Sequence, residues 1–370
     1  MYLNQESGSC VCPFEDIWRW NTISFCGIAV GQLVIGPLSD KYGRKSPLIL
    51  SLMVFSVSTL GCLYAPDIYW FIFFRLIQGL AGAGGLVISK SIATDLYEGK
   101  ELTRFFSMLS SVQGIAPICA PVLGGLLLGV TSWKGIFWIL FAIGLLLLVT
   151  LFFFKESLPR AARREGGVWV AFRRYVPVLG HGRFMCYVLV QAFAMGVMFT
   201  YIAASPFIFQ NHYGLSPVAY SLCFGANAVA VMLGSLTVSF FRGATQAMRI
   251  GVVGFGLLSL LVAAVLVSGA SVMIVEVCLF VFMIFLGLIL PSSTMLALDL
   301  ERENSGNASA VLGFLMFLFG GVLSPLTGLG DMLQTTSLIM VLCCAAALIC
   351  TLLTTARFSR YILKGHMVKA

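Results

Sequence analysis

The residues that could do chemistry are a few charges set in a very apolar chain. Residues 36–45, GPLSDKYGRK, hold the densest group, which is Asp40, Lys41, Arg44 and Lys45. Apolar runs rich in Leu, Ile, Val and Phe lie on both sides of it. Charges beside a membrane fix topology, form ion pairs or bind protons and ionic substrates. No HExxH, CxxC, GxSxG or P-loop pattern occurs, so we expect transport rather than an enzyme.

Arg75 is the charge placed deepest in an apolar run, FIFFRLIQGL. A charge at the centre of a membrane helix costs about 2.5–3.5 kcal/mol, which favours a functional role. Gln78 shares its helical face because it follows three residues later. The alternative is a packing role, in which Arg75 extends to the interface or bonds carbonyls of a neighbouring helix. Glu276 lies near the outer end of its run, and we expect a carboxylate at headgroup level there.

Proline and glycine punctuate another run, GIAPICAPVLGGLLLG, at residues 114–129. Proline leaves a carbonyl unpaired and bends a helix, while glycine lets a neighbouring backbone approach closely. The pattern indicates either a moving helix interface or tight packing without motion. The residues concerned are Pro117, Pro121, Gly124 and Gly125.

These residues are carried by membrane-spanning helices. Of the 370 residues, 59% are hydrophobic and only 10% are charged, whereas soluble domains are about a quarter charged. The apolar runs are continuous rather than alternating, so they predict helices and not barrel strands. We predict eleven spans, at 20–38, 47–65, 68–90, 104–129, 133–154, 183–209, 217–241, 248–268, 272–297, 307–329 and 334–356.

Positive charges give the orientation. Nearly all of the 23 lysines and arginines fall on one side if residues 40–45 are cytoplasmic, which places the C-terminus inside and the N-terminus outside. The net charge of +8 is therefore a topology signal and not a sign of nucleic-acid binding. The predicted parts are an outer segment 1–19, a bundle 20–154 of five spans, a basic cytoplasmic linker 155–182, a bundle 183–356 of six spans and a cytoplasmic tail 357–370.

Most of the 11 cysteines lie within the predicted spans. Free cysteine packs as a small apolar residue, so we expect no cofactor and no metal site there. Cys10 and Cys12 lie in the outer segment, where a disulfide or a metal is conceivable, but the signal is weak because no histidine is nearby.

Three motifs resemble those of the major facilitator superfamily. GPLSDKYGRK is similar to the family's loop signature G-x-L-[SA]-D-[RK]-x-G-R-[RK], and RLIQG at 75–79 resembles R-x-x-Q-G. APVLGG at 120–125 resembles the antiporter motif G-P-x-x-G-G, with Ala120 where the first glycine is usual. AASPFIFQNHYGLSP and GQLVIGPLSD further resemble the Bcr/CflA branch of bacterial drug:proton antiporters. The likeness covers about residues 25–356.

The resemblance implies a fold of two helical bundles and a set of roles. Asp40 would approach the start of a helix near residues 303–310, and Arg44 would pair with Asp95, which together would latch the outward-open state. The latch residues are Gly36, Asp40, Gly43, Arg44, Lys45 and Asp95. Proton coupling or substrate contact would fall to Arg75, Gln78 and Gly79. A cavity would be lined by Gln113, Phe199, Tyr201 and Asn227.

The family has twelve helices, so the eleven predicted spans lack the first. MYL at the start resembles the outer end of that helix, just after a membrane-embedded aspartate. Either the true start lies upstream, the chain is a fragment, or an eleven-span form works alone. We expect a monomeric bacterial inner-membrane exporter that exchanges protons for small amphipathic molecules or drugs. The alternatives are a remnant without activity and a metabolite transporter of the same fold.

Overall fold

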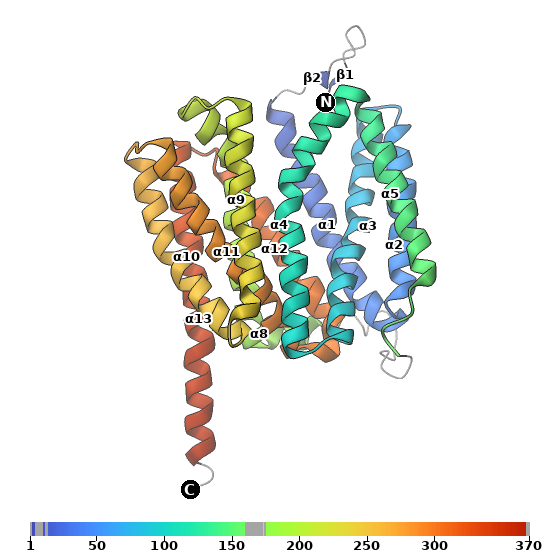
Figure 1. The fold of residues 1–370 in the computed structure, drawn as a ribbon. Coiled ribbons are helices and arrows are strands. Elements are labelled where there is room, and N and C mark those ends of the chain that lie inside the picture. Colours follow the sequence, from blue (N-terminus) through green and yellow to red (C-terminus); the bar gives the residue numbers. More distant parts are fainter. Residues whose placement is uncertain (1, 4–9, 12–13, 160–172, 174, 368–370) are drawn as a thin grey trace. The chain divides into compact units, whose positions relative to one another are not determined.

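The computed structural model describes residues 2–3, 10–11, 14–159, 173 and 175–367, with side chains at 27–112, 127, 130–159, 173, 175–216 and 218–354. Helices make up nearly all of it, because a backbone in lipid must satisfy its own hydrogen bonds. Their bounds are α1 (Phe14–Tyr42), α2 (Lys45–Leu63), α3 (Ile68–Leu96), α4 (Gly99–Val130), α5 (Trp133–Phe153), α7 (Tyr175–Gly180), α8 (Gly182–Pro206), η2 (Phe207–His212), α9 (Pro217–Thr237), η3 (Val238–Phe240), α10 (Ala244–Val267), α11 (Val272–Leu300), η4 (Arg302–Asn304), α12 (Ser305–Leu326) and α13 (Met332–Met367) (Figure 1). Two short strands, β1 (Tyr2–Leu3) and β2 (Cys10–Val11), pair antiparallel.

Nine helical stretches within the described residues are long and apolar enough to cross a membrane. They are Lys45–Leu63, Ile68–Leu96, Trp133–Phe153, Gly182–His212, Val218–Phe240, Ala244–Val267, Val272–Leu300, Arg302–Leu326 and Met332–Thr354. Each overlaps a predicted span, and the prediction of an all-α membrane protein is confirmed. The two remaining predicted spans, 20–38 and 104–129, fall on α1 and α4. The total of eleven stays a prediction.

Several helices run further than the apolar runs that predicted them. α1 continues through Pro37 to Tyr42, so residues 40–42 of the predicted charged loop belong to the last turn of a helix. Only Gly43 and Arg44 separate α1 from α2. α3 continues to Leu96 and carries Asp95 on its last turn. α13 continues to Met367, past the ends of its neighbours in Figure 1 and into the predicted tail. The hydropathy signal stops at the first polar residues, although the helix continues beyond them.

The chain divides into two compact units. Unit 1 comprises Met1–Leu96, Ala120–Val176 and Arg302–Gly321, and unit 2 comprises Tyr97–Cys119, Pro177–Glu301 and Val322–Ala370. The start of α12 thus groups with α1 to α3. The predicted bundles, 20–154 and 183–356, are a different division and stay a prediction.

Inside each unit the helices pack side by side. In unit 1, α1 packs against α3, and α2 contacts both α3 and α5. In unit 2, α11 contacts α8, α9 and α10, while α13 contacts α8 and α10 (Figure 1). Gly234 of α9 and Gly287 of α11 face each other, and a Cβ on either would overlap the other helix's backbone. Such small residues allow membrane helices to approach closely.

Candidate functional site: a buried charge cluster and a carboxylate beside an apolar pocket

The turn between α1 and α2 brings Arg44 into the interior of unit 1. Gly43 adopts a φ of 89°, which an L side chain rarely tolerates, so glycine is needed at this position. The chain reverses within two residues, and Arg44 is only 1% exposed. A buried arginine must find hydrogen-bond acceptors for its guanidinium.

The Arg44 guanidinium contacts oxygens from three helices. It donates to Asp40 Oδ1 at 2.7 Å, Ser39 Oγ at 2.9 Å, Asp95 Oδ2 at 2.8 Å, Asp95 Oδ1 at 3.2 Å and Ser305 Oγ at 2.7 Å. Burial by itself lowers the pKa of Arg44, but the hydrogen bonds and charges of Asp95 and Asp40 outweigh it and raise that pKa. Asp40, Arg44, Asp95 and Ser305 are called the Arg44 cluster below.

Asp40 also caps the start of α12. Its Oδ1 accepts from the backbone N–H of Gly306 at 2.9 Å, and its Oδ2 accepts from that of Asn307 at 3.2 Å. A carboxylate is favoured there by the unpaired N–H groups and by the helix dipole. The close approach depends on Gly36, because a Cβ on it would lie 2.5 Å from Gly306 O. The structure thus places Asp40 at the predicted helix start, while its role as a latch stays a prediction.

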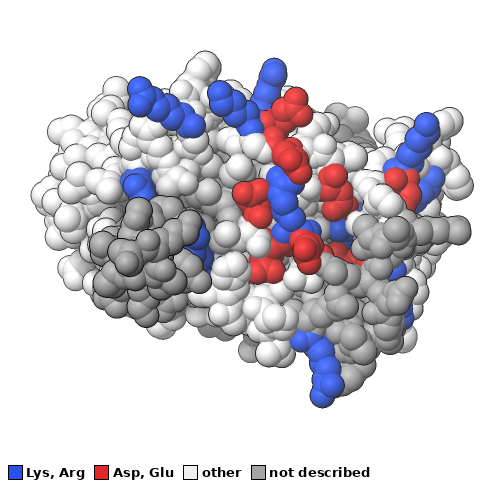
Figure 2. All heavy atoms as spheres, turned by 90° about the horizontal axis from the view of Figure 1, so that it is seen from below, with Lys and Arg blue, Asp and Glu red and all other residues white. Residues whose placement is uncertain are grey.

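The segment after α5 closes the other side of the Arg44 cluster. Glu156 accepts from the backbone N–H of Arg44 at 2.7 Å and of Lys45 at 3.2 Å. Lys45 Nζ donates to Phe154 O at 2.7 Å. The sequence places Glu156 only in the linker, since nothing in its spacing points to the α1–α2 turn. Acidic and basic side chains gather on the face shown in Figure 2.

The C-terminal end of the linker forms a hydrogen bond with α1. Tyr175 of α7 donates its hydroxyl to Leu33 O at 2.6 Å. Burial, reinforced by the charge of Asp40, raises the pKa of Tyr175 and keeps the hydroxyl protonated. The linker is therefore anchored to unit 1 at Glu156 and at Tyr175.

Arg75 lies within unit 1 in a partly buried, aromatic setting. Its Nη1 donates to Gln78 Oε1 at 3.0 Å, and Gln78 Nε2 donates to Thr59 Oγ1 at 2.7 Å. The guanidinium carbon lies 4.8 Å from the Phe137 ring centroid, a cation–π distance. No carboxylate is within ion-pair distance of Arg75 among the side chains that the structure describes. The predicted Arg75–Gln78 proximity is present, and their role in coupling stays a prediction.

Several predicted residues lie in α4. Gln113 and the four motif residues are on its helical backbone, but their side chains lie outside the described residues. The motif residues are Pro117, Pro121, Gly124 and Gly125. Gly79, the last residue of RLIQG, lies on α3.

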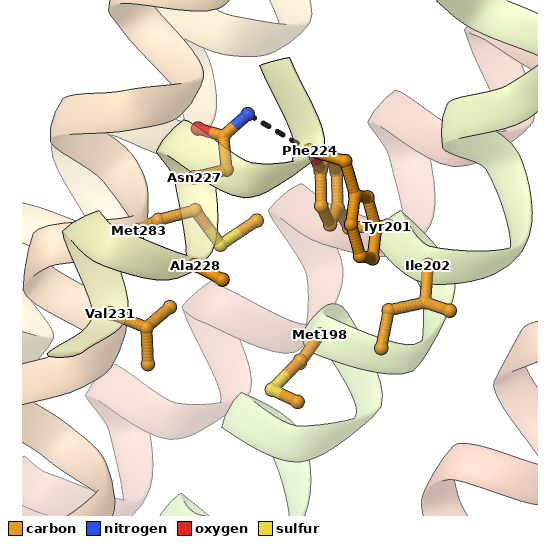
Figure 3. Close-up of a pocket in the computed structure, with 8 residues that line it drawn as sticks. All are labelled: Met198, Tyr201, Ile202, Phe224, Asn227, Ala228, Val231 and Met283. Atoms are coloured by element: carbon orange, nitrogen blue, oxygen red, sulfur yellow. Dashed lines mark hydrogen bonds between the residues drawn. The ribbon is translucent and has the colours of Figure 1, made fainter. Parts of the chain in front are cut away.

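A small pocket lies in unit 2 between α8, α9 and α11. Its wall is mostly aliphatic, aromatic and thioether, with one amide (Figure 3). The lining residues are Met198, Tyr201, Ile202, Phe224, Asn227, Ala228, Val231 and Met283. Tyr201 and Phe224 stack with their ring planes 7° apart. Two of the predicted cavity residues, Tyr201 and Asn227, are thus in its wall, whereas Phe199 is not among the lining residues.

Glu276 of α11 reaches this pocket wall through Asn227. Asn227 Nδ2 donates to Glu276 Oε2 at 3.0 Å and Oε1 at 3.1 Å, and also to Tyr201 Oη at 3.0 Å. The carboxylate of Glu276 is partly buried and accepts both of these hydrogen bonds from α9. Its location at headgroup level stays a prediction. The sequence carried no sign of this partner, because Asn227 is far from Glu276 along the chain.

Lys90 is a buried cation of unit 1. It lies within α3, near the end of the predicted span 68–90, and is 5% exposed.

The chain is similar to known membrane transporters. Residues 18–325 match the family model of the Major Facilitator Superfamily. The chain is 34% identical over 316 residues to an uncharacterized MFS-type transporter, YdgK, of Bacillus subtilis (strain 168), covering 84% of this chain and 79% of that protein. It is 27% identical over 316 residues to a bicyclomycin resistance protein homolog of Haemophilus influenzae, covering 81% and 76%.

Solved structures of other proteins share this fold. The crystal structure of the transporter FucP in the outward conformation superposes with a TM-score of 0.74 at 15% identity, covering 93% of this chain and 91% of FucP. At that identity the likeness concerns the fold alone.

Proposed function

Because the chain belongs to the major facilitator superfamily and is a multi-pass membrane transporter, we propose that it exports small amphipathic molecules in exchange for protons. The observation that carries the substrate class is the unit 2 pocket, whose apolar and aromatic wall holds a single amide. A relative named for bicyclomycin resistance supports the same class. In this proposal the energy for export comes from the proton gradient.

The Arg44 cluster supports an alternating-access mechanism in which two helical bundles, 20–154 and 183–356, rock about a central site. With Asp40 on the N-terminus of α12, the cluster stabilises the outward-open state. When α12 moves away, Asp40 loses its backbone donors and Arg44 loses Ser305. The kinked motif of α4 forms the second moving interface, and Arg75 with Gln78 takes part in proton coupling or substrate contact.

The charge distribution supports the orientation. We propose a monomer in the bacterial inner membrane with the C-terminus in the cytoplasm, because nearly all lysines and arginines then obey the positive-inside rule.

Efflux from living cells tests the proposal. The chain is expressed in a host without its own multidrug pumps, and the accumulation of ethidium is followed by fluorescence. We expect expressing cells to hold less ethidium than cells with an empty vector, and a proton uncoupler to remove the difference. Equal accumulation in both cultures, or a difference that survives the uncoupler, contradicts the proposal for this class of substrate.

A further inference from the structure

Lys90 is a cation inside unit 1 that the Arg44 cluster does not include. It lies on α3 about one and a half turns before Asp95, and it is 5% exposed. A lysine beside lipid or at a helix end normally extends its ammonium group to water. Lys90 is instead packed among helices, where an ammonium group needs acceptors and a counter-charge.

The acids of unit 1 leave Lys90 without an ion pair. Among the described side chains, no carboxylate lies within ion-pair distance of its ammonium group and no acceptor bonds to it. The described acids of unit 1 that are at least partly buried are Asp40, Asp95 and Glu156. The first two bind Arg44, and the third accepts hydrogen bonds from the backbone of the α1–α2 turn.

Gln32 of α1 is a second buried donor in the same unit. It is 1% exposed, and its Nε2 has no hydrogen-bond partner among the described residues. α1 packs against α3, the helix of Lys90. An ammonium group and an amide N–H that both lack acceptors match the oxygens of a carboxylate, which accept from several donors at once.

The first half of α12 brings these two donors to one region. Ser91, the residue after Lys90, donates to Ser309 Oγ at 3.4 Å. Gln32 reaches α12 at Gly313, where an added Cβ would overlap its amide. Ser309 and Gly313 are four residues apart and therefore share one face of α12. The parts of α1 and α3 that carry the two donors thus meet α12 within about one turn of each other.

The neighbouring side chains suit the apolar part of an acid. Ala83 and Val87 precede Lys90 on the same face of α3 and are fully buried. Ala310 and Val311 of α12 are buried as well. In the structure α12 lies against both α1 and α3, so a ligand needs α12 to withdraw before it can enter.

We propose that Lys90 and Gln32 bind the carboxylate of an amphipathic organic acid when α12 has moved away from α1 and α3. This inference rests on the proposed function, which it deepens by naming organic acids as a substrate class. When α12 returns, the bound carboxylate supplies the negative charge that the protein itself does not provide to Lys90. No bond is made or broken in this step.

Calorimetric titration of the purified full-length protein in detergent tests the site without any transport step. The probe is 2-naphthoate, and neutral 2-naphthamide is the control of matched shape. At neutral pH we expect the wild type to bind naphthoate at least about tenfold more tightly than naphthamide. Equal affinity for the two probes, or no binding of naphthoate, overturns the inference.

Variants assign the binding to Lys90. Lys90→Met keeps the length of the side chain and should lower naphthoate affinity about tenfold or more, with naphthamide affinity unchanged. Lys90→Arg keeps the charge and should retain the preference for naphthoate. Lys100→Met, at an exposed lysine of α4, should behave as the wild type. Wild-type naphthoate affinity in Lys90→Met, or an equal loss for both probes, contradicts the assignment.

Thermal unfolding separates binding from a structural role. Because Lys90 has no partner among the described residues, Lys90→Met should melt at the same temperature as the wild type or higher. Naphthoate should raise the melting temperature of the wild type and not that of Lys90→Met. A markedly lower melting temperature of the ligand-free variant would assign Lys90 to structure and overturn the inference.

Asp40→Asn tests whether the site opens with α12. This change weakens the contact of α1 with the α12 N-terminus, so a larger fraction of the protein should be able to bind. The apparent affinity for naphthoate should then rise, because it scales with that fraction. An unchanged or lower affinity contradicts entry through the withdrawal of α12.

The two proposals fail separately. If cells show no ethidium efflux but the purified protein binds naphthoate through Lys90, the export proposal fails and the acid site stands. If efflux depends on the proton gradient but Lys90→Met binds naphthoate as the wild type does, the acid site is wrong and the export proposal stands.

Discussion

One arginine, Arg44, holds oxygens from α1, α3 and α12 at the same time. The planar guanidinium can do this because it presents several donors in fixed directions, whereas an ammonium is a single point charge. The stability of the Arg44 cluster therefore depends on the shape of the side chain at position 44 as well as on its charge.

Replacement of Arg44 tests that sensitivity. Arg44→Ala leaves Asp40 and Asp95 buried without a cation, and we expect it to lower the free energy of unfolding by about 3–5 kcal/mol. Arg44→Lys keeps one charge and should lose less. Thermal unfolding in detergent measures both, with Lys100→Ala, an exposed residue of α4, as the control. A melting temperature for Arg44→Ala equal to that of the control would mean that the cluster does not contribute.

Asp40→Asn separates charge from shape in the same cluster. The amide can still accept one hydrogen bond, but it loses the charged contacts to Arg44 and to the α12 N-terminus, each worth about 1.5–3 kcal/mol. We expect normal amounts in the membrane and a transport rate lowered about tenfold. Efflux rate per amount of membrane protein is the measurement, and an unchanged rate refutes the latch.

The substitution Arg75→Ala tests the role of Arg75 in proton coupling. We expect Arg75→Ala to abolish proton coupling, since no other charge lies in the described part of this helix segment between Asp67 and Lys90. The measurement is efflux with and without an uncoupler. Efflux that still depends on the proton gradient reduces Arg75 to a packing role on Phe137.

At the element scale, the contact between α1 and α12 depends on glycine. A Cβ on Gly36 would lie 2.5 Å from Gly306 O and 2.6 Å from the Ala310 Cβ, so the two backbones would have to separate. That separation removes Asp40 from the α12 N-terminus as well.

Gly36→Ala should therefore destabilise the protein by about 1–3 kcal/mol, the usual cost of overpacking. Gly85→Ala on α3 is the matched control, because nothing lies within 4 Å of its added Cβ. Thermal unfolding of the two purified variants compares them. Equal melting temperatures would show that α12 can shift from α1 without cost.

The sequence predicted which segments are helices but not where they end or what they contact. Continuous apolar runs predicted spans such as 272–297, because lipid leaves the backbone no other choice. Hydropathy could not show that α1 continues to Tyr42, since Asp40 and Lys41 are polar yet helical. Motif resemblance pointed to Asp40 and Asp95, whereas Glu156 and Glu276 acquire their partners only when distant helices come together.

At the scale of the whole molecule, we propose a transporter that uses a proton gradient to expel amphipathic molecules. In this proposal the Arg44 cluster stabilises one state of the transport cycle, and the unit 2 pocket offers a surface for the substrate. Neither feature produces coupling alone. Coupling requires that proton movement in one direction drives substrate movement in the other.

Transport into liposomes measures that coupling directly. The purified protein is placed in vesicles with an acidic lumen, the membrane potential is clamped with potassium and valinomycin, and entry of ethidium is followed. The account predicts accumulation in the lumen that needs the acid-inside gradient, stops with an uncoupler and is reduced in Asp40→Asn. Accumulation without a gradient, or only with the opposite gradient, would contradict proton-driven export.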